Sequence, residues 1–317
     1  YRSLSAYECV AEVRVEPERG WFSQYLPGTL HLGDPGARDA SIHAIQGCIP
    51  HMTLIPVAVE RLAVFGRPAP GNVFLHARER SHEGNSYLYD IEVRDEKGEL
   101  YERWEGLLLQ AVERNRRKGS WGPVLLAPYM ERRMNELLPE KRLAVVVESH
   151  APGPKRRGKS NGALQQAAGN GATIRRRSDG RPEANGKQVI SASHTGDVTL
   201  AIAGEGPVGC DLETVVERPM PVWKELLGEE RSMLADLIAL QTGDRYDVAA
   251  TRVWGAAESL RKTGAMFDMP IVLQSSDSDG WVILSAGSAT IATYADRSAE
   301  DAAGGIVATM IANGDAA

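Results

Sequence analysis

Two short acidic motifs contain the side chains that could do chemistry together in this chain. In the first, VGCDLE at residues 208–213, Asp211 and Glu213 alternate with apolar residues, so on a strand both carboxylates project from one face. In the second, WGAAESLRK at residues 254–262, Glu258 and Lys262 are four apart and share a face on a helix. Three carboxylates suit Mg²⁺, which usually keeps some waters and also binds substrate phosphates. The two motifs together therefore predict a site for Mg²⁺ and a phosphate-bearing substrate.

Either motif alone is also typical of a solvated face of a strand or a helix. Two more motifs precede them in order, GRP at residues 180–182 and SASHT at residues 191–195. The full ordered set resembles the phosphopantetheinyl transferases of the large pseudo-dimeric type related to the surfactin-synthetase activator. That family's pattern runs G-[KR]-P, S-x-S-H, [VI]-G-x-D-x-E and W-x-x-K-E-x-x-x-K. The resemblance covers residues 121–317.

The resemblance implies transfer of 4′-phosphopantetheine from coenzyme A to a serine of an acyl carrier protein, with release of adenosine 3′,5′-bisphosphate. Asp211, Glu213 and Glu258 would hold Mg²⁺ on the pyrophosphate. Glu258 would also accept the serine proton, and Lys262 would bind coenzyme A and stabilise the leaving phosphate. One departure matters, because Ala257 stands where the family usually has lysine. That change removes a cation beside the metal-site glutamate.

Residues 150–182 are the most basic part of the chain. Such a run is often a solvated loop, but the resemblance implies that it holds the phosphates of coenzyme A, and arginine binds phosphate in a bidentate fashion. Arg157 and Arg181 are the expected contacts, Arg181 from the GRP motif and Arg157 from its distance upstream. Ser193 and His194 are expected to bind phosphate as well, although a lone histidine is often structural.

The first part of the chain reads as a helix followed by antiparallel strands. Asp39 stands before an apolar helical pattern of Ile42, Ile45 and Ile49 that Pro50 ends, so it is placed as a helix N-cap. Strand-like alternation then predicts strands over residues 56–65, 73–79, 86–94 and 100–111, with a turn at residues 95–99. A central helix wrapped by antiparallel strands results.

This arrangement is similar to a hot-dog fold, and Asp39 and His43 match the D-x-x-x-[HQ] motif in the second half of polyketide synthase dehydratases. The surrounding residues 38–57 resemble more narrowly the dehydratase of iterative enediyne polyketide synthases, in which a phosphopantetheinyl transferase follows the dehydratase. The resemblance implies that Asp39 is the dehydratase acid and His43 its hydrogen-bond partner, with the catalytic histidine supplied by an upstream first hot-dog. Without that context Asp39 is a plain helix cap and His43 a surface histidine.

Composition favours two domains, since 317 residues with 43% hydrophobic content can form two cores. The basic, glycine-bearing stretch at residues 113–123 places the boundary near residue 120. A net charge of −6 argues against a general nucleic-acid binder. Three cysteines without metal-ligand spacing fit a reduced, cytoplasmic compartment. With no signal peptide, long apolar run or initiator methionine, the chain is expected to be a non-membrane piece of a longer polypeptide.

The overall prediction is an α+β chain with a partial hot-dog over residues 1–120 and a pseudo-dimeric transferase fold over residues 121–317. In the second domain, helices are expected at residues 129–137 and 223–240. Strands are expected at residues 143–147, 188–193, 271–274, 281–285, 289–294 and 306–311. Mg²⁺, coenzyme A and an acyl carrier protein are the predicted cofactor and partners, and self-association is left open. The alternative is a dehydratase half-domain or structural docking module whose coenzyme A site no longer catalyses transfer.

Overall fold

The computed structural model describes residues 1–15, 34–66, 71–114, 121–138, 142–150, 156–169, 171–265, 269–295 and 305–313. The chain divides into two compact units, Tyr1–Arg116 and Arg117–Ala317. The division falls in the basic stretch that the sequence marks as a connection, close to the expected boundary at residue 120. No helix in the described part of the chain has the length and apolar character needed to cross a membrane.

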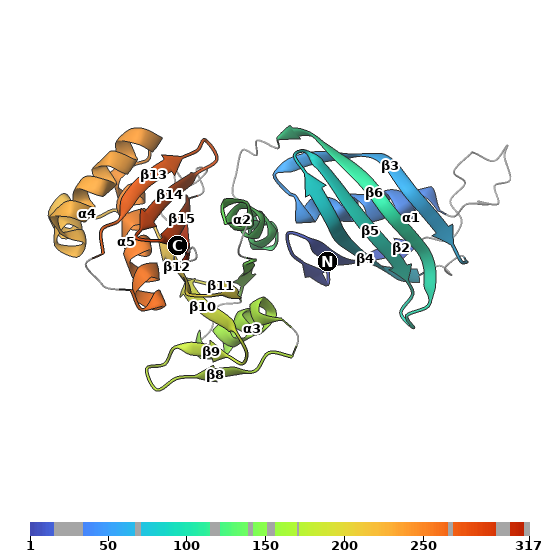
Figure 1. Cartoon of the computed structure of the whole chain (residues 1–317), viewed down its shortest axis with the longest axis horizontal. Coiled ribbons are helices and arrows are strands. Elements are labelled where there is room, and N and C mark those ends of the chain that lie inside the picture. Colours follow the sequence, from blue (N-terminus) through green and yellow to red (C-terminus); the bar gives the residue numbers. More distant parts are fainter. Residues whose placement is uncertain are drawn as a thin grey trace. The chain divides into compact units, whose positions relative to one another are not determined.

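The first unit is one antiparallel sheet packed against one helix (Figure 1). Its strands stand in the order β1-β2-β4-β5-β6-β3. Their bounds are Ser3–Leu4 for β1, Glu8–Val15 for β2, Met52–Val64 for β3, Gly71–Glu83 for β4, Ser86–Arg94 for β5 and Leu100–Arg114 for β6. Four of these strands were predicted. The prediction missed β1 and β2, although β2 buries alternate residues from Cys9 to Val15 and shows the same period of two.

Helix α1, Pro35–Ile45, continues as a 3₁₀ turn, Gln46–Cys48, and supplies the apolar face that covers the sheet. Ile45 and Ile49 are fully buried in the core of this unit, as their helical spacing predicts.

The N-cap prediction for Asp39 was wrong. Asp34 caps the helix, since its carboxylate accepts hydrogen bonds from the amides of Gly36 at 2.8 Å and Ala37 at 3.3 Å. Pro35 can open the helix at its first position because its fixed φ suits a helix start and no amide is lost there.

The second unit has two halves, each with a sheet and covering helices. The first half contains α2 (Pro123–Leu137), β7 (Ala144–Ser149), α3 (Arg156–Ala168), β10 (Gln188–Thr195) and β11 (Val198–Glu205), and its sheet has the order β10-β11-β7. A small hairpin of β8 (Ile174–Arg176) and β9 (Pro182–Ala184) lies between α3 and β10 in the chain. Helix α3 covers one face of the sheet through Ala163, Leu164 and Ala167.

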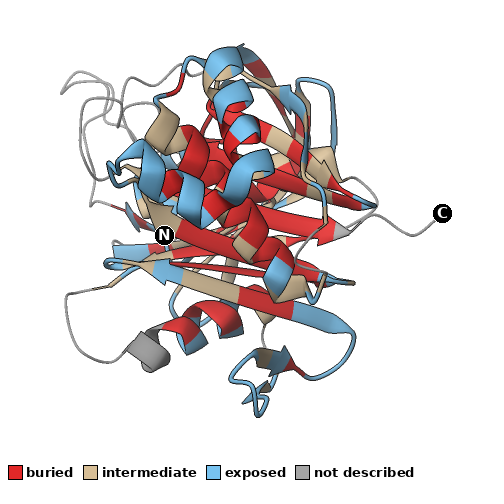
Figure 2. Ribbon diagram, turned by 90° about the vertical axis from the view of Figure 1, so that its left-hand side faces the viewer, coloured by how far each residue is buried: buried red, intermediate tan, exposed pale blue. Residues whose placement is uncertain are grey.

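The second half is a five-stranded antiparallel sheet in the order β12-β16-β15-β14-β13. These strands are β12 (Val208–Thr214), β13 (Val272–Ser276), β14 (Trp281–Ala286), β15 (Ala289–Ala295) and β16 (Ile306–Asn313). Helices α4 (Met220–Thr242) and α5 (Tyr246–Thr263) pack on one of its faces. The other face forms a common core with α2 and the first sheet. Figure 2 shows the buried positions in red, gathered on the strands and the inner sides of the helices.

Side chains join the two halves where β10 meets β12. The hydroxyl of Ser191 accepts the amide hydrogen of Cys210 at 3.1 Å, and that of Ser193 donates to Asp211 at 2.9 Å. Because side chains alternate along a strand, Ser191 and Ser193 project from the same side of β10. The serines of the SASHT motif therefore hold the strand that carries the first acidic motif.

Candidate functional site

The two acidic motifs meet at Asp211 and Lys262. The ammonium of Lys262 donates to Asp211 Oδ1 at 2.8 Å and to the carbonyl oxygen of Cys210 at 2.8 Å. Asp211 Oδ1 also accepts the hydroxyl of Ser193. The Asp211 side chain is 5% exposed, so this charge is almost fully removed from water and needs its cation. Residues from three motifs thus form one hydrogen-bonded cluster.

Close packing of α5 on β12 brings these motifs together. A Cβ at Gly209 would lie 2.5 Å from the carbonyl oxygen of Ser259, so the glycine of the first motif lets the helix approach the strand. Buried Arg252 fixes the same helix from its other end. Its guanidinium bonds to Asp244 at 3.0 Å and to the carbonyl oxygens of Thr293 and Gly280 at 3.0 Å each. Helix α5 is therefore tied to the sheet at Arg252, about two turns before Glu258 and about three turns before Lys262.

The other two predicted carboxylates lie near this cluster. Glu258 Oε2 accepts from Arg261, with Nη2 at 2.8 Å and Nε at 3.1 Å. Burial, the largest effect, and the negative charge of Asp211 raise the pKa of Glu213 above its ordinary value. The charge of Glu258 adds to this increase. A hydrogen bond from Trp254 lowers this pKa and so acts in the opposite direction. Glu213 is therefore close enough to the other two carboxylates for their charges to act on it.

The expected metal triad is not assembled. Across the described residues, no group of three or more His, Cys, Asp or Glu side chains is arranged to hold a metal ion. The physical reason is that the cations of the second motif bind the carboxylates, Lys262 on Asp211 and Arg261 on Glu258. Asp211 Oδ2 is buried without a hydrogen-bond partner, which leaves one acceptor oxygen for a water or a cation.

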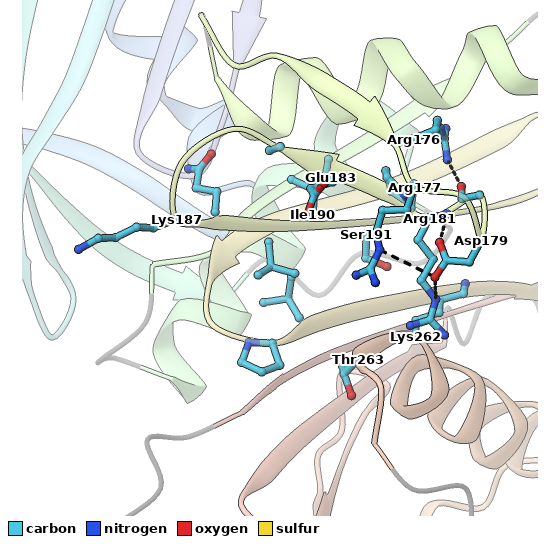
Figure 3. Close-up of a pocket in the computed structure, with 18 of the residues that line it drawn as sticks. Arg176, Arg177, Asp179, Arg181, Glu183, Lys187, Ile190, Ser191, Lys262 and Thr263 are labelled. Atoms are coloured by element: carbon cyan, nitrogen blue, oxygen red, sulfur yellow. Dashed lines mark hydrogen bonds and ion pairs between the residues drawn. The ribbon is translucent and has the colours of Figure 1, made fainter.

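A basic cavity of about 600 Å³ opens beside the cluster (Figure 3). The β8–β9 hairpin, strand β10 and the end of α5 line it. Its charged lining residues are Arg176, Arg177, Asp179, Arg181, Glu183, Lys187, Arg261 and Lys262. Arg181 Nη2 donates to the carbonyl oxygen of Arg261 at 3.3 Å, so the hairpin meets α5 at this point. The excess of guanidinium and ammonium groups over carboxylates suits a phosphate-bearing ligand.

A second cavity, of about 440 Å³, lies against Glu258 and is lined by Val222, Glu225, Leu226, Arg231, Trp254, Ala257 and Glu258. Its walls come from α4 and α5 and combine apolar side chains with the charged groups of Glu225, Arg231 and Glu258. Ala257 is one of those walls, so a lysine at this position would project into the cavity. The departure from the transferase pattern therefore leaves this space open.

Ser193 and His194, two of the expected phosphate contacts, are not part of the lining of the basic cavity. His194 is exposed, and by strand alternation it lies on the opposite side of β10 from Ser193. The side chain of Arg157 lies outside the described residues. Sequence reasoning missed Lys187 and Arg261, which do line the cavity. Arg261 carried a usable signal, because it is adjacent to Lys262 within the second motif.

In the first unit, Asp39 and His43 lie one turn apart on α1, with Asp39 Oδ2 and His43 Nε2 at 3.6 Å. Their side chains are 73% and 74% exposed, so solvent surrounds both groups. The neighbouring Arg38 turns inward and forms a buried pair with Glu102 at 2.8 Å. Arg38 therefore anchors α1 to β6. In this orientation of the helix, Asp39 and His43 face solvent.

Three comparisons relate the chain to known proteins. No curated protein sequence matched it. Solved structures with partial similarity include the Escherichia coli PaaI protein from the phenylacetic acid degradation operon, at 14% identity over 35% of this chain and 76% of that one, with a TM-score of 0.27. The acetyl-CoA-bound smu.793 of Streptococcus mutans has 8% identity over 36% of this chain and 88% of that one, with a TM-score of 0.28. Similarity at this level carries no conclusion about activity.

The family comparison concerns the first unit. Residues 2–119 match the family model described as the polyketide synthase dehydratase N-terminal domain. The description names the N-terminal domain, whereas the Asp39 motif implied the second half, so the assignment to the second half rests on that motif alone. The match covers less than half of the chain and does not extend over the second unit. Residues 2–119 are therefore similar to a polyketide synthase dehydratase domain, and their sheet and helix have a hot-dog arrangement.

Proposed function

We propose that the first unit is a dehydratase half-domain of a polyketide synthase of the enediyne type, with Asp39 as the acid and His43 as its partner. The family match over residues 2–119 is the observation that carries this part, and it is the better supported part of the proposal. Elimination of water needs an acid and a base in different protonation states around an enclosed substrate. Asp39 and His43 are solvated on one helix face, so an upstream hot-dog would have to complete the site.

The chain alone should therefore not dehydrate a 3-hydroxyacyl carrier protein. Mass spectrometry of the acylated carrier protein after incubation with the chain would show no loss of water. Turnover that disappears in Asp39→Ala would contradict this expectation, because it would mean that a complete site already exists within these residues.

For residues 121–317 we propose transfer of 4′-phosphopantetheine from coenzyme A to a serine of an acyl carrier protein. The observation that carries this part is the contact between Lys262 and Asp211, which joins the two acidic motifs at the edge of the basic cavity. A cavity lined by arginines and lysines suits the phosphates of coenzyme A. Two sheet-and-helix halves joined along β10 and β12 agree with the pseudo-dimeric fold that the resemblance implies.

The reaction would form a bond between the serine Oγ and the β-phosphorus of coenzyme A and break the bond from that phosphorus to the bridging oxygen. Glu258 would accept the serine proton, and adenosine 3′,5′-bisphosphate would leave with the bridging oxygen. Lys262 and Arg181 would neutralise the phosphate charge, which is most of what a protein contributes to phosphoryl transfer.

Mg²⁺ is proposed as the cofactor, although the three carboxylates are not assembled into a metal site in the described residues. The unpartnered acceptor Asp211 Oδ2 favours a cation here, and so does the negative charge of Asp211, which together with burial, the larger cause, raises the pKa of Glu213. Asp211, Glu213 and Glu258 would hold it, and it would supply charge neutralisation on the pyrophosphate when bound.

Incubating an apo carrier protein with coenzyme A, Mg²⁺ and the full chain tests the transferase part. The intact mass of the carrier protein should rise by one phosphopantetheine, and the rise should be lost in Asp211→Ala, in Glu258→Ala and with excess chelator. Arg181→Ala should weaken coenzyme A binding. Lys224→Ala, on the exposed side of α4, should change neither coenzyme A binding nor the mass increase of the carrier protein. Full activity in either carboxylate variant would remove the metal assignment.

The alternative for the second unit is a coenzyme A-binding docking module that no longer catalyses transfer. Ala257 and the pairing of the carboxylates with Lys262 and Arg261 favour it. Coenzyme A binding without any carrier-protein modification, across several carrier proteins, would support this alternative over transfer.

A further inference from the structure

The missing lysine at Ala257 leaves the candidate site without a cation where the transferase pattern has one. Ala257 is 8% exposed and borders the open cavity of about 440 Å³ next to Glu258. A methyl group cannot attract phosphate or balance the charge of Glu258. Any cation beside Glu258 must therefore come from another position.

Arg261 brings a cation to Glu258 from the side of the basic cavity, outside the lining of the cavity at Ala257. It lies four residues after Ala257, so both residues are on the same face of α5 and are about 6 Å apart along the helix axis. Its guanidinium bonds to Glu258 Oε2 at 2.8 Å, and its side chain also lines the basic cavity beside Lys262. The Arg261 side chain is 54% exposed, so it has room to turn from Glu258 toward a bound ligand.

We infer that Arg261 supplies the positive charge that Ala257 cannot, by pairing with Glu258 before substrate binds and by binding the pyrophosphate of coenzyme A afterwards. This inference rests on the proposed transferase function. A guanidinium has parallel donors that match phosphate oxygens, so Arg261 can serve both partners. The hydrogen bond and the negative charge of Glu258 raise the pKa of Arg261, which keeps the side chain charged.

The contact from Arg181 supports the second role. Arg181 Nη2 reaches the carbonyl oxygen of Arg261, which brings an arginine from the hairpin to the base of the Arg261 side chain. A phosphate between these residues and Lys262 would have three cations within reach. Glu258 would then be released from its ion pair at the moment when the reaction needs a free carboxylate.

Replacing Arg261 tests the inference. Isothermal titration of the full chain with coenzyme A, and separately with inorganic pyrophosphate, should show about tenfold weaker binding in Arg261→Ala, as expected for loss of one charge-assisted hydrogen-bonded contact. Arg261→Lys keeps the positive charge without the parallel donors, so its affinities should lie between those of Arg261→Ala and of the unchanged chain. Lys224→Ala, which removes a cation that lines neither cavity, should bind as the unchanged chain does.

Unchanged affinity in a folded Arg261→Ala, checked by circular dichroism, would overturn the inference. So would an Arg261→Lys variant that binds no better than Arg261→Ala, or a loss of affinity found in Arg231→Ala instead. Carrier-protein modification measured in parallel separates this result from the proposed function. A chain that binds coenzyme A through Arg261 without transferring phosphopantetheine would refute the transferase alone, and one that binds neither probe would refute both.

Discussion

Lys262 has a structural task as well as the proposed chemical one. It donates to Asp211 Oδ1 and to the carbonyl oxygen of Cys210, and so it links the end of α5 to β12. The Asp211 side chain is 5% exposed and that of Lys262 is 25% exposed. Removing the lysine would leave a buried carboxylate that keeps the hydrogen bond from the Ser193 hydroxyl but loses its cation, and an uncompensated buried charge is strongly destabilising.

Lys262→Met should therefore lower the free energy of unfolding of the second unit by about 2 kcal/mol, less than for a fully buried pair because Lys262 reaches solvent. Adding Asp211→Asn should recover most of this loss, since a neutral amide is cheaper to bury than a carboxylate. Urea unfolding of the single and double variants at neutral pH gives the comparison, with Lys224→Met as the surface control. A Lys262→Met variant as stable as the unchanged chain would show that the pair does not hold α5 to β12.

At the scale of elements, helix α1 illustrates how a cap is chosen. Two aspartates precede apolar helical positions, Asp34 and Asp39, and both have the side chain of a good N-cap. Asp34 takes the position because Pro35 starts the helix and the free amides of Gly36 and Ala37 follow it. Asp39 is then inside the helix, with its side chain in solvent beside His43.

Asp34→Ala should cost the first unit about 1 kcal/mol, the usual value for a lost N-cap hydrogen bond. Asp39→Ala should leave stability within about 0.5 kcal/mol of the unchanged chain, as exposed substitutions usually do. Thermal unfolding of the two variants side by side makes a matched test, since both remove one carboxylate from the same helix. Equal destabilisation by both would contradict the capping assignment.

At the scale of the whole molecule, the two units have separate cores. Among the described residues, the buried core of the first unit lies between Cys9 and Ala111, and the three buried cores of the second lie from Ala127 onward. Domains with their own hydrophobic cores can in principle fold alone. The proposed phosphate-binding and metal-binding residues belong entirely to the second unit.

Residues 117–317 expressed alone should therefore fold cooperatively and bind coenzyme A within about threefold of the affinity of the full chain. Circular dichroism melting and isothermal titration of the separated unit measure both properties. A separated unit that folds normally but binds coenzyme A much more weakly would show that the dehydratase region contributes to the site. An unfolded product would instead mean that the second unit needs the first for stability.

The sequence by itself determined the local elements that carry the site. Alternation of apolar and charged residues at 208–213 predicted a strand with Asp211 and Glu213 on one side, and the structure has β12 there. The spacing of Glu258 and Lys262 predicted a shared helix face, and α5 provides it. Such patterns succeed because strand and helix periods are properties of short stretches of chain. The dehydratase resemblance of the first 120 residues was likewise confirmed by the family match.

Only the tertiary structure decided which groups meet. The pairing of Lys262 with Asp211 joins residues 51 positions apart in sequence, and the contact of Arg181 with Arg261 joins residues 80 apart. Sequence reasoning expected three carboxylates around a metal, whereas two of them are paired with cations of the second motif. Packing of α5 on β12 brings Lys262 to Asp211, and Arg261 binds Glu258 within α5. It also expected His194 in the phosphate site, but the strand that presents Ser193 inward turns His194 to the other side. Contacts of this kind depend on how close two elements pack, and Gly209 and Arg252 set that distance from outside the residues that do the chemistry.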